Sequence, residues 1–506
     1  MIAIGKKGAS SGSFVRDFTA SIVVFLVAMP LCMGIAIASG VPPEKGLITG
    51  IVGGLVVGFL AGSPLQVSGP AAGLAVIVFE LVRDHGLSAL GPILVLAGLL
   101  QFVAGVARLG GFFRSISPAV VHGMLAGIGA LIVVGQFHIL FDGKPLSNGL
   151  ANLTAMPGRI LGLSLDMRAT EYALMIGLVT IAVMLAWEKL RPASLKLVPG
   201  ALLGVVAATL IAWMTGLDIA RVDVPASLIG AIEAPGTGFF ASFGNPSLLA
   251  TALAIAFIAS AETLLSAAAV DRMHDGPRTD YNKELRAQGV GNLLCGLAGA
   301  LPMTGVIVRS SANVQAGAKT RTSTILHGVW ILGFVALLPW LLREIPMAAL
   351  GGILVVTGWR LVSVTHVKHL FHNYGVLPAA TWAATFLLVV FTDLLTGVLV
   401  GLALSLIELI PYRKTLRLKV EEEHVGEESQ LALHGSATFV SLTHLTAVLE
   451  RIPNERPVHI DLHKLNGIDH TSEEMVREWL ARRNGSGKLV RLSGPDSLIA
   501  RFAAAH

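Results

Sequence analysis

The chain has 506 residues, of which 54% are hydrophobic and only 14% are charged. Soluble domains carry about 25% charged residues, so most of this chain is expected to lie in a lipid bilayer. The formal net charge of +5 fits the basic cytoplasmic loops of a membrane protein and does not require a nucleic-acid partner. The sequence contains no Walker loop, zinc signature or nucleophile elbow, which argues against an enzyme, an ATP-driven pump and a bound cofactor.

Fourteen apolar runs are expected to enter or cross the membrane. In chain order they cover residues 18–39, 45–62, 69–82, 88–107, 117–138, 171–187, 198–215, 247–270, 286–301, 305–317, 322–343, 346–361, 378–392 and 394–411. Lysine and arginine are concentrated in the even-numbered connections, which predicts cytoplasmic N- and C-termini. We therefore expect a cytoplasmic segment over 1–17 and a transmembrane domain over 18–411.

Charged residues become frequent from Tyr412 onwards. The patterns that follow predict strands over 430–435, 458–462 and 488–492 and helices over 442–451 and 472–483. Residues 412–506 are therefore expected to form a small soluble α/β domain on the cytoplasmic side.

The third and tenth runs begin with helix-breaking segments, Gln66-Val67-Ser68-Gly69-Pro70-Ala71-Ala72-Gly73 and Thr304-Gly305-Val306-Ile307-Val308-Arg309-Ser310. Each predicts an extended stretch followed by a helix too short to cross a bilayer. Because the two runs are seven apart, the second has inverted topology, which predicts seven-plus-seven inverted repeats with the half-helices head to head. Such a pair indicates the binding site of a transporter.

Backbone groups supply the chemistry at these breaks. A helix N-terminus presents unpaired N–H groups and about half a positive charge, so two of them together attract an anion. Gly69 and Gly305 allow the backbone to approach a ligand closely, and Ser68 and Thr304 are candidates to cap the helices or contact the ligand. The alternative is that both segments are ordinary helix breaks.

Two charged residues lie inside apolar runs, where charge is costly. Arg309 is either a positive element beside an anion site or one half of a structural ion pair with Glu262. Glu262, which shares a helix face with Ser266, has three possible roles: a proton carrier, the partner of Arg309, or a ligand of a hard cation such as Na⁺.

Several motifs resemble the SulP family of anion transporters, which are relatives of the animal sulfate and chloride/bicarbonate exchangers and of prestin. They are Ala28-Met29-Pro30-Leu31, the stretches 37–43, 66–70 and 282–292, and Arg309-Ser310-Ser311-Ala312-Asn313-Val314-Gln315-Ala316-Gly317-Ala318-Lys319-Thr320. The C-terminal segment resembles a STAS domain.

The resemblance implies an all-α polytopic fold with core and gate domains, as in uracil-type transporters, in a bacterial inner membrane and usually as a homodimer. It implies an anion held between the third and tenth half-helices and carried by elevator-like movement of the core. By position, it assigns Glu262 to coupling with a proton or cation, with Ser266 and Thr304 as further coupling candidates. The positions that match anion-site residues of the family are Ser68, Gly69, Ala71, Ala72, Gly305, Val306, Ile307, Val308 and Arg309.

Departures from the family pattern narrow the choice of candidate substrates. Leu31 stands where many members have glutamine, and the stretch 306–308 is apolar where others have serines. A small anion held by backbone N–H groups, such as bicarbonate, is therefore favoured over sulfate. The bicarbonate-transporting branch commonly has aspartate at the position of Glu262, which favours proton over sodium coupling here. His470 follows Asp469 where regulatory STAS domains have a phosphorylatable serine, so regulation at that position is not expected.

Other functions stay open at this point. A sulfate or dicarboxylate symporter or exchanger and an uncoupled anion channel would share the fold. A nucleobase–cation symporter shares the inverted repeat but binds an uncharged base, which Arg309 disfavours. In a membrane sensor or scaffold, Glu262 and Arg309 would have no need to be buried.

Overall fold

The computed structural model describes residues 11–503 except the short segments 115–116, 147, 164–167, 226–228, 234, 237–238, 240–242, 272, 275, 408–409, 411–416, 426–427, 454–455 and 486–489. Residues 1–10 of the expected N-terminal segment, the expected boundary at Tyr412 and the start of the strand expected over 488–492 lie outside the described residues. The chain divides into two units, Met1–Gly110 with Leu125–Val362, and Gly111–Met124 with Ser363–His506.

Apolar helices build the first unit, because a helix satisfies its own backbone hydrogen bonds within lipid. Their bounds are α1 Ser11–Ala38, α2 Pro43–Val52, α3 Gly58–Leu60, α4 Ala75–His85, α5 Leu90–Val106, α8 Gly149–Leu161, α9 Ala169–Leu190, α10 Gly200–Met214, α11 Pro246–Asp271, α12 Tyr281–Leu297, α13 Ile307–Gln315, α14 Thr322–Leu337, α15 Pro339–Leu342 and α16 Met347–Leu361. Helix α6 (Gly110–Arg114) and helix α7 (Pro118–Leu140) each have residues in both units.

Each of the fourteen predicted runs contains a helix, although the bounds shift. Six stretches of the described chain are long and apolar enough to cross a membrane: Ser13–Ala38, Pro43–Leu60, Leu87–Val106, Pro118–Leu140, Ala169–Leu190 and Pro246–Asp271. The second of these contains one π-helical segment, η1 (Gly53–Val57), which the sequence pattern does not indicate. Helices α8 and α17 (Val364–Tyr374) occupy segments that were expected to be connections.

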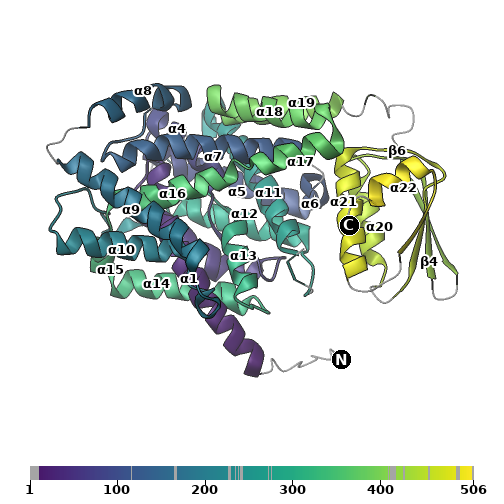
Figure 1. Ribbon diagram of the computed structural model, residues 1–506, viewed down its shortest axis with the longest axis horizontal. Helices are drawn as coiled ribbons and strands as arrows, with labels where there is room; N and C mark the ends of the chain where they lie inside the picture. The colour runs from purple at the N-terminus through teal and green to yellow at the C-terminus, as the bar shows by residue number, and fades with distance from the viewer. Residues whose placement is uncertain are drawn as a thin grey trace. The chain divides into compact units, whose positions relative to one another are not determined.

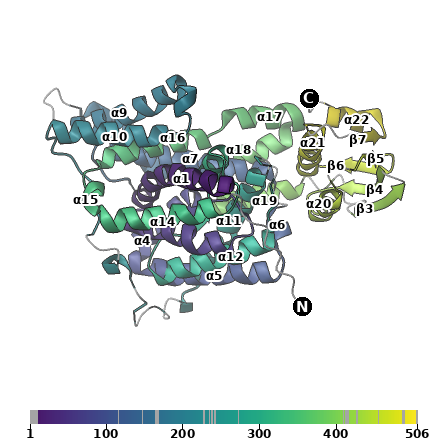
Figure 2. The same ribbon diagram turned by 90° about the horizontal axis from the view of Figure 1, so that it is seen from below.

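Two β-strands of three residues each interrupt the helices of this unit. Strand β1 (Ser68–Pro70) pairs antiparallel with strand β2 (Met303–Gly305), with Ser68 opposite Gly305 and Pro70 opposite Met303. The predicted extended stretches at the third and tenth runs are therefore confirmed, and they lie against each other. Helix α12 runs alongside α5 (Figures 1 and 2), and it also contacts β2.

The second unit combines helices with a sheet. Its helices are α17, α18 (Val376–Phe391), α19 (Leu394–Ile407), α20 (Leu442–Arg451), α21 (His470–Gly485) and α22 (Asp496–Ala503). Its strands are β3 (Lys419–Val425), β4 (Glu428–Ala437), β5 (Val458–Asp461), β6 (Leu465–Ile468) and β7 (Val490–Ser493). The sheet order is β3-β4-β5-β7, with β6 also paired to β4, and only the β3–β4 pair is antiparallel.

A separate apolar core supports this sheet. It contains Leu431 and Leu433 from β4, Val458 and Ile460 from β5, and Trp479 from α21. Helices α20 and α21 lie side by side against the sheet (Figure 1). The predicted helices over 442–451 and 472–483 and the strands over 430–435 and 458–462 are confirmed, whereas β3 and β6 were not predicted.

Candidate functional site

The two helix breaks meet at the β1–β2 pair. The pairing continues beyond the strands, since Ala71 N donates to Pro302 O over 3.2 Å and Val306 N donates to Val67 O over 2.9 Å. Because the strands are antiparallel, the following helices leave the pair at opposite ends. A short 3-10 turn, η2 (Ala72–Leu74), leads into α4, and α13 begins at Ile307. Both helix N-termini therefore adjoin one strand pair.

Neither N-terminus is capped by the side chain that precedes it. Ala71 before η2 and Val306 before α13 make no side-chain cap. The first helical bond of α13 is donated by Ser310 N to Val306 O, so the N–H groups of the three preceding residues have no acceptor within the helix. Ile307 and Val308 are 38% and 42% exposed, so the side chains of the first turn of α13 are accessible at the protein surface.

Arg309 is fully buried, at 0% exposed. None of its three side-chain nitrogens has a hydrogen-bond partner of normal geometry in the part of the chain that the structure describes. The guanidinium packs on Gly69, where a Cβ atom would overlap Nη1. It also lies close enough to the Cys32 thiol on α1 for a weak side-chain hydrogen bond, and it interacts electrostatically with His327 on α14; neither neighbour is a carboxylate.

Glu262 lies on α11 beside the first break. Its carboxylate accepts a hydrogen bond from the Gly73 backbone N–H at the start of α4, and a Cβ on Gly73 would lie 2.6 Å from Oε2. That oxygen has no hydrogen-bond partner in the described chain. Glu262 contacts Gly73 and Arg309 contacts Gly69, and the two side chains do not form the ion pair that was one alternative from the sequence. The two charged side chains therefore contact the first break at positions four residues apart, Gly69 and Gly73.

The hydroxyl candidates have different surroundings. Ser68 is buried and its hydroxyl accepts a hydrogen bond from Gln288 Nε2 over 2.6 Å, so its side chain is held by α12. The Thr304 hydroxyl is buried without a partner among the described residues. Ser266 is buried on α11, one turn beyond Glu262.

Sequence reasoning missed most of the residues that fix the breaks. Thr263, next to Glu262, accepts from Gly305 N through Oγ1 and from Gln66 Nε2 through its carbonyl. Ser310 Oγ accepts from Val67 N, and Asn313 Nδ2 donates to Leu65 O. These three residues are polar side chains within apolar segments, which is itself a signal of a structural or functional role. The sequence interpretation gave none of them a role.

Metal-ion chemistry has no preformed site in the described chain, where no group of three or more His, Cys, Asp or Glu side chains comes together. A single hard cation beside Glu262 would need carbonyl and hydroxyl oxygens to complete its ligands. The arrangement as it stands offers backbone N–H groups and a buried guanidinium to an anion, and one carboxylate to a proton or cation.

The family assignment rests on residues 14–385, which match the sulfate permease family. The bicarbonate transporter BicA of Synechocystis is 26% identical over 77% of this chain and 69% of its own length. YvdB of Bacillus subtilis, a candidate sulfate transporter by its name, is 29% identical over 99% of this chain and 96% of its own length.

Solved structures show the same fold. The transmembrane domain of a cyanobacterial BicA superposes with a TM-score of 0.65 at 23% identity, covering 78% of this chain and 97% of that one. The structure of SLC26A9 gives a TM-score of 0.71 at 15% identity, covering 98% of this chain and 87% of that one. The helical architecture, the paired helix breaks and the match over 14–385 agree, and the chain belongs to the sulfate permease family of membrane anion transporters.

Proposed function

We propose that this protein is a secondary-active transporter of a small inorganic anion, with bicarbonate as its preferred substrate. The observation that carries the proposal is the buried Arg309, which has no carboxylate partner among the described residues and lies beside two uncapped helix N-termini. A buried cation without an acidic partner is costly in a membrane, and a bound anion supplies the missing partner. In this proposal the anion lies between η2 and the start of α13, beside the backbones of 68–72 and 305–308. The N–H groups of Ala71, Gly305 and Val306 already donate within the protein, so those of Ile307 and Val308 are the donors proposed at α13.

The apolar side chains at the opening favour a small anion. Ile307 and Val308 are the exposed residues of the first turn of α13, and neither donates a side-chain hydrogen bond. Recognition then falls to backbone N–H groups, which bind an anion without a dedicated side chain. The BicA relatives, which are named as bicarbonate transporters, support this choice. Sulfate is the second candidate, because other relatives carry that name.

Glu262 supplies the coupling in this proposal. Its carboxylate sits at the N-terminus of the first half-helix and reduces the positive potential there. Binding of a proton or a cation at Glu262, aided by Ser266 and Thr304, removes that negative charge. Anion binding at the neighbouring N–H groups is then favoured, so the two solutes are taken up together.

The wider architecture forms part of the proposal. Fourteen spans in two inverted repeats would give core and gate domains, with both termini in the cytoplasm of a bacterial inner membrane. A homodimer with a STAS-like domain over 412–506 completes the arrangement. The separate core of that region and its mixed sheet support a distinct domain.

Uptake into proteoliposomes tests the function. Labelled bicarbonate, sulfate and succinate are supplied under imposed sodium or proton gradients, and bicarbonate uptake should be fastest. Glu262→Gln should lose gradient-driven uptake while retaining anion exchange. Glu188→Gln, which removes an acid ion-paired with Arg360 at the end of α9, is the matched control and should behave like the wild type. If none of the three anions is taken up, the proposed function is wrong.

A further inference from the structure

Helix α12 carries a row of polar residues that none of the preceding roles uses. Glu284, Gln288 and Asn292 are spaced four apart, so they lie on one face of the helix. All three are fully buried. Burying three polar side chains on one helix face is costly unless each finds partners, so the contacts they make identify their purpose.

Asn292 holds strand β2. Its Oδ1 accepts from Met303 N over 2.7 Å and its Nδ2 donates to Met303 O over 3.0 Å. The side-chain amide thus contacts both backbone groups of one residue, as a neighbouring strand would. The same Nδ2 donates to Gln101 Oε1 on α5 over 2.7 Å, and Gln101 Nε2 donates to Ser260 Oγ on α11 over 3.2 Å. Three helices therefore share the contact with β2.

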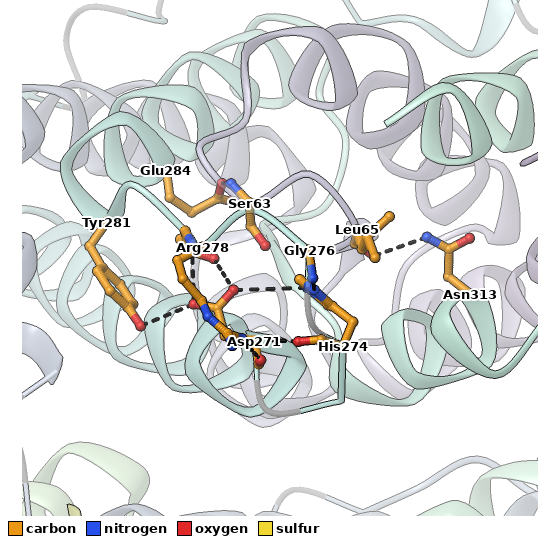
Figure 3. A network of polar contacts seen from close by, with 10 residues as sticks. Ser63, Leu65, Asp271, His274, Gly276, Arg278, Tyr281, Glu284 and Asn313 are labelled. Atoms are coloured by element: carbon orange, nitrogen blue, oxygen red, sulfur yellow. Dashed lines mark hydrogen bonds and ion pairs between the residues drawn. The ribbon is translucent and has the colours of Figure 1, made fainter. Parts of the chain in front are cut away.

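Gln288 and Glu284 hold strand β1 and the segment before it. Gln288 Nε2 donates to Ser68 Oγ over 2.6 Å and to Glu284 Oε1 over 3.0 Å. Glu284 Oε2 accepts from Ser63 N over 2.9 Å, and Asn313 Nδ2 from α13 donates to Leu65 O over 3.0 Å. Figure 3 shows Glu284 beside Ser63 and Asn313 reaching Leu65.

The start of α12 is itself anchored. Asp271, the last residue of α11, accepts from Thr279 N over 3.2 Å, from Thr279 Oγ1 over 2.9 Å and from Tyr281 Oη over 3.4 Å. Arg278 donates to the Asp271 carbonyl. These contacts gather around Asp271 in Figure 3. They fix where the polar face of α12 begins, so Glu284, Gln288 and Asn292 meet the two breaks at set positions.

We propose that α12 is the positioning element of the anion site, with Asn292 and Gln288 setting the relative placement of the two helix N-termini. A pair of three-residue strands is too short to be stable by itself, so its geometry depends on outside contacts. One rigid helix holds β2 through Asn292 and β1 through Gln288. This inference rests on the proposed anion transport, because its consequence is read out as anion affinity.

Leucine substitutions test the inference in the full-length protein. Asn292→Leu keeps the size of the side chain but removes all three hydrogen bonds. Since β2 then loses the contacts that fix its position, the concentration for half-maximal anion uptake should rise about tenfold. Hydrogen–deuterium exchange should increase in peptides covering 67–75 and 302–310 and stay unchanged in α9 and α10. Asn292→Asp, which retains the acceptor for Met303 N, should recover part of the affinity.

Asn282→Leu is the matched control, because it removes a hydrogen bond of the same helix that leads to Gly110 and to neither strand. It should leave the half-saturating concentration within about twofold of wild type. If Asn292→Leu does not fold, Gln288→Leu tests the same claim through Ser68. Wild-type uptake with unchanged affinity in a folded Asn292→Leu or Gln288→Leu protein would overturn the inference. Absence of uptake by the wild type would instead count against the proposed function.

Discussion

At the scale of single residues, the two buried charges have separate surroundings. Arg309 packs on Gly69 and Glu262 contacts Gly73, so neither neutralises the other. A salt bridge would have tied α11 to α13 and fixed the helices together. Separate charges leave each side chain able to contact a solute of its own, which the coupling proposed above assumes.

Arg309→Gln distinguishes a ligand-directed arginine from a structural one. Since the guanidinium is buried without an acidic partner, its removal should leave the melting temperature unchanged or higher. Anion affinity should fall about tenfold or more, because the positive charge near the site is lost. Thermal unfolding in detergent and a titration of uptake against anion concentration measure the two effects. A large fall in melting temperature with unchanged affinity would mean that Arg309 is structural.

Asp469 in the C-terminal region makes stability depend on pH. Burial raises the pKa of Asp469 above its ordinary value of 3.8, although hydrogen bonds from Ser472 N and Phe439 N oppose the shift. A raised pKa means that the folded state binds the proton more tightly than the unfolded state. The stabilisation is complete below 3.8 and is lost as the pH rises through the folded pKa.

Asp469→Asn removes this titration and provides the comparison. The difference in melting temperature, wild type minus variant, should be larger at about pH 4.5 than at about pH 7.5. The variant also loses one of two N–H···O bonds, which lowers its stability by about 1 kcal/mol at both values. If the melting-temperature difference between wild type and Asp469→Asn instead grows as the pH rises, the raised pKa of Asp469 is contradicted.

At the scale of elements, a seam of glycines joins α5 to α12. Gly98 approaches so closely that a Cβ atom would lie 2.6 Å from Gly289 O, and a Cβ on Gly296 would lie 2.7 Å from Gly91 O. Small residues let helix backbones approach in membranes, where dispersion contacts replace the hydrophobic effect. This close packing keeps α12, with its row of polar residues, in a fixed place beside the two breaks.

Gly98→Leu should therefore destabilise the protein by about 1–3 kcal/mol, because the backbones would have to separate. Gly333→Leu on α14 is the control, since a Cβ at that position meets no atom within 4 Å. Thermal unfolding of both variants in detergent checks the prediction. Equal melting temperatures would show that the seam contributes nothing.

Sequence patterns predicted the helices and the two breaks because hydropathy and Ser-Gly-Pro or Thr-Gly signals are local. The spacing of seven runs predicts that the two breaks lie near each other, but not that they pair as strands. The register of β1 with β2 depends on tertiary contacts. The role of Asn292 was missed because the ninth run was expected to begin at residue 286, which left Glu284 outside it and hid the spacing of four. Contacts that join distant segments, such as Thr263 with Gly305, leave no local signature.

At the level of the whole molecule, contacts within the second unit join its C-terminal region to the segment 111–124 and to α17. Ser117, just before α7, lies 3.3 Å from His470 Nε2 at the start of α21, and Thr443 Oγ1 donates to Gly111 O over 3.0 Å. The ring of Tyr374 on α17 lies 5.8 Å from the ring of His470. These contacts join the C-terminal region to the segment 111–124 within one compact unit.

Cross-linking tests that statement. Ser117→Cys with His470→Cys, in a chain whose two natural cysteines are replaced, should react with a short thiol cross-linker in membranes. Uptake should remain within about twofold of the uncross-linked protein, because the linked segments belong to one unit. Failure to cross-link, or complete loss of uptake on cross-linking, would contradict it.

We propose that the anion binds at the start of α13, where Ile307 and Val308 are exposed. The measurement that tests it most directly is labelled bicarbonate uptake by Val308→Trp in proteoliposomes, with Leu332→Trp as control because that side chain is exposed on α14. A tryptophan at 308 fills the opening, so uptake should fall about tenfold or more while the control keeps the wild-type rate. Wild-type uptake by Val308→Trp, at equal reconstituted protein, would contradict the account.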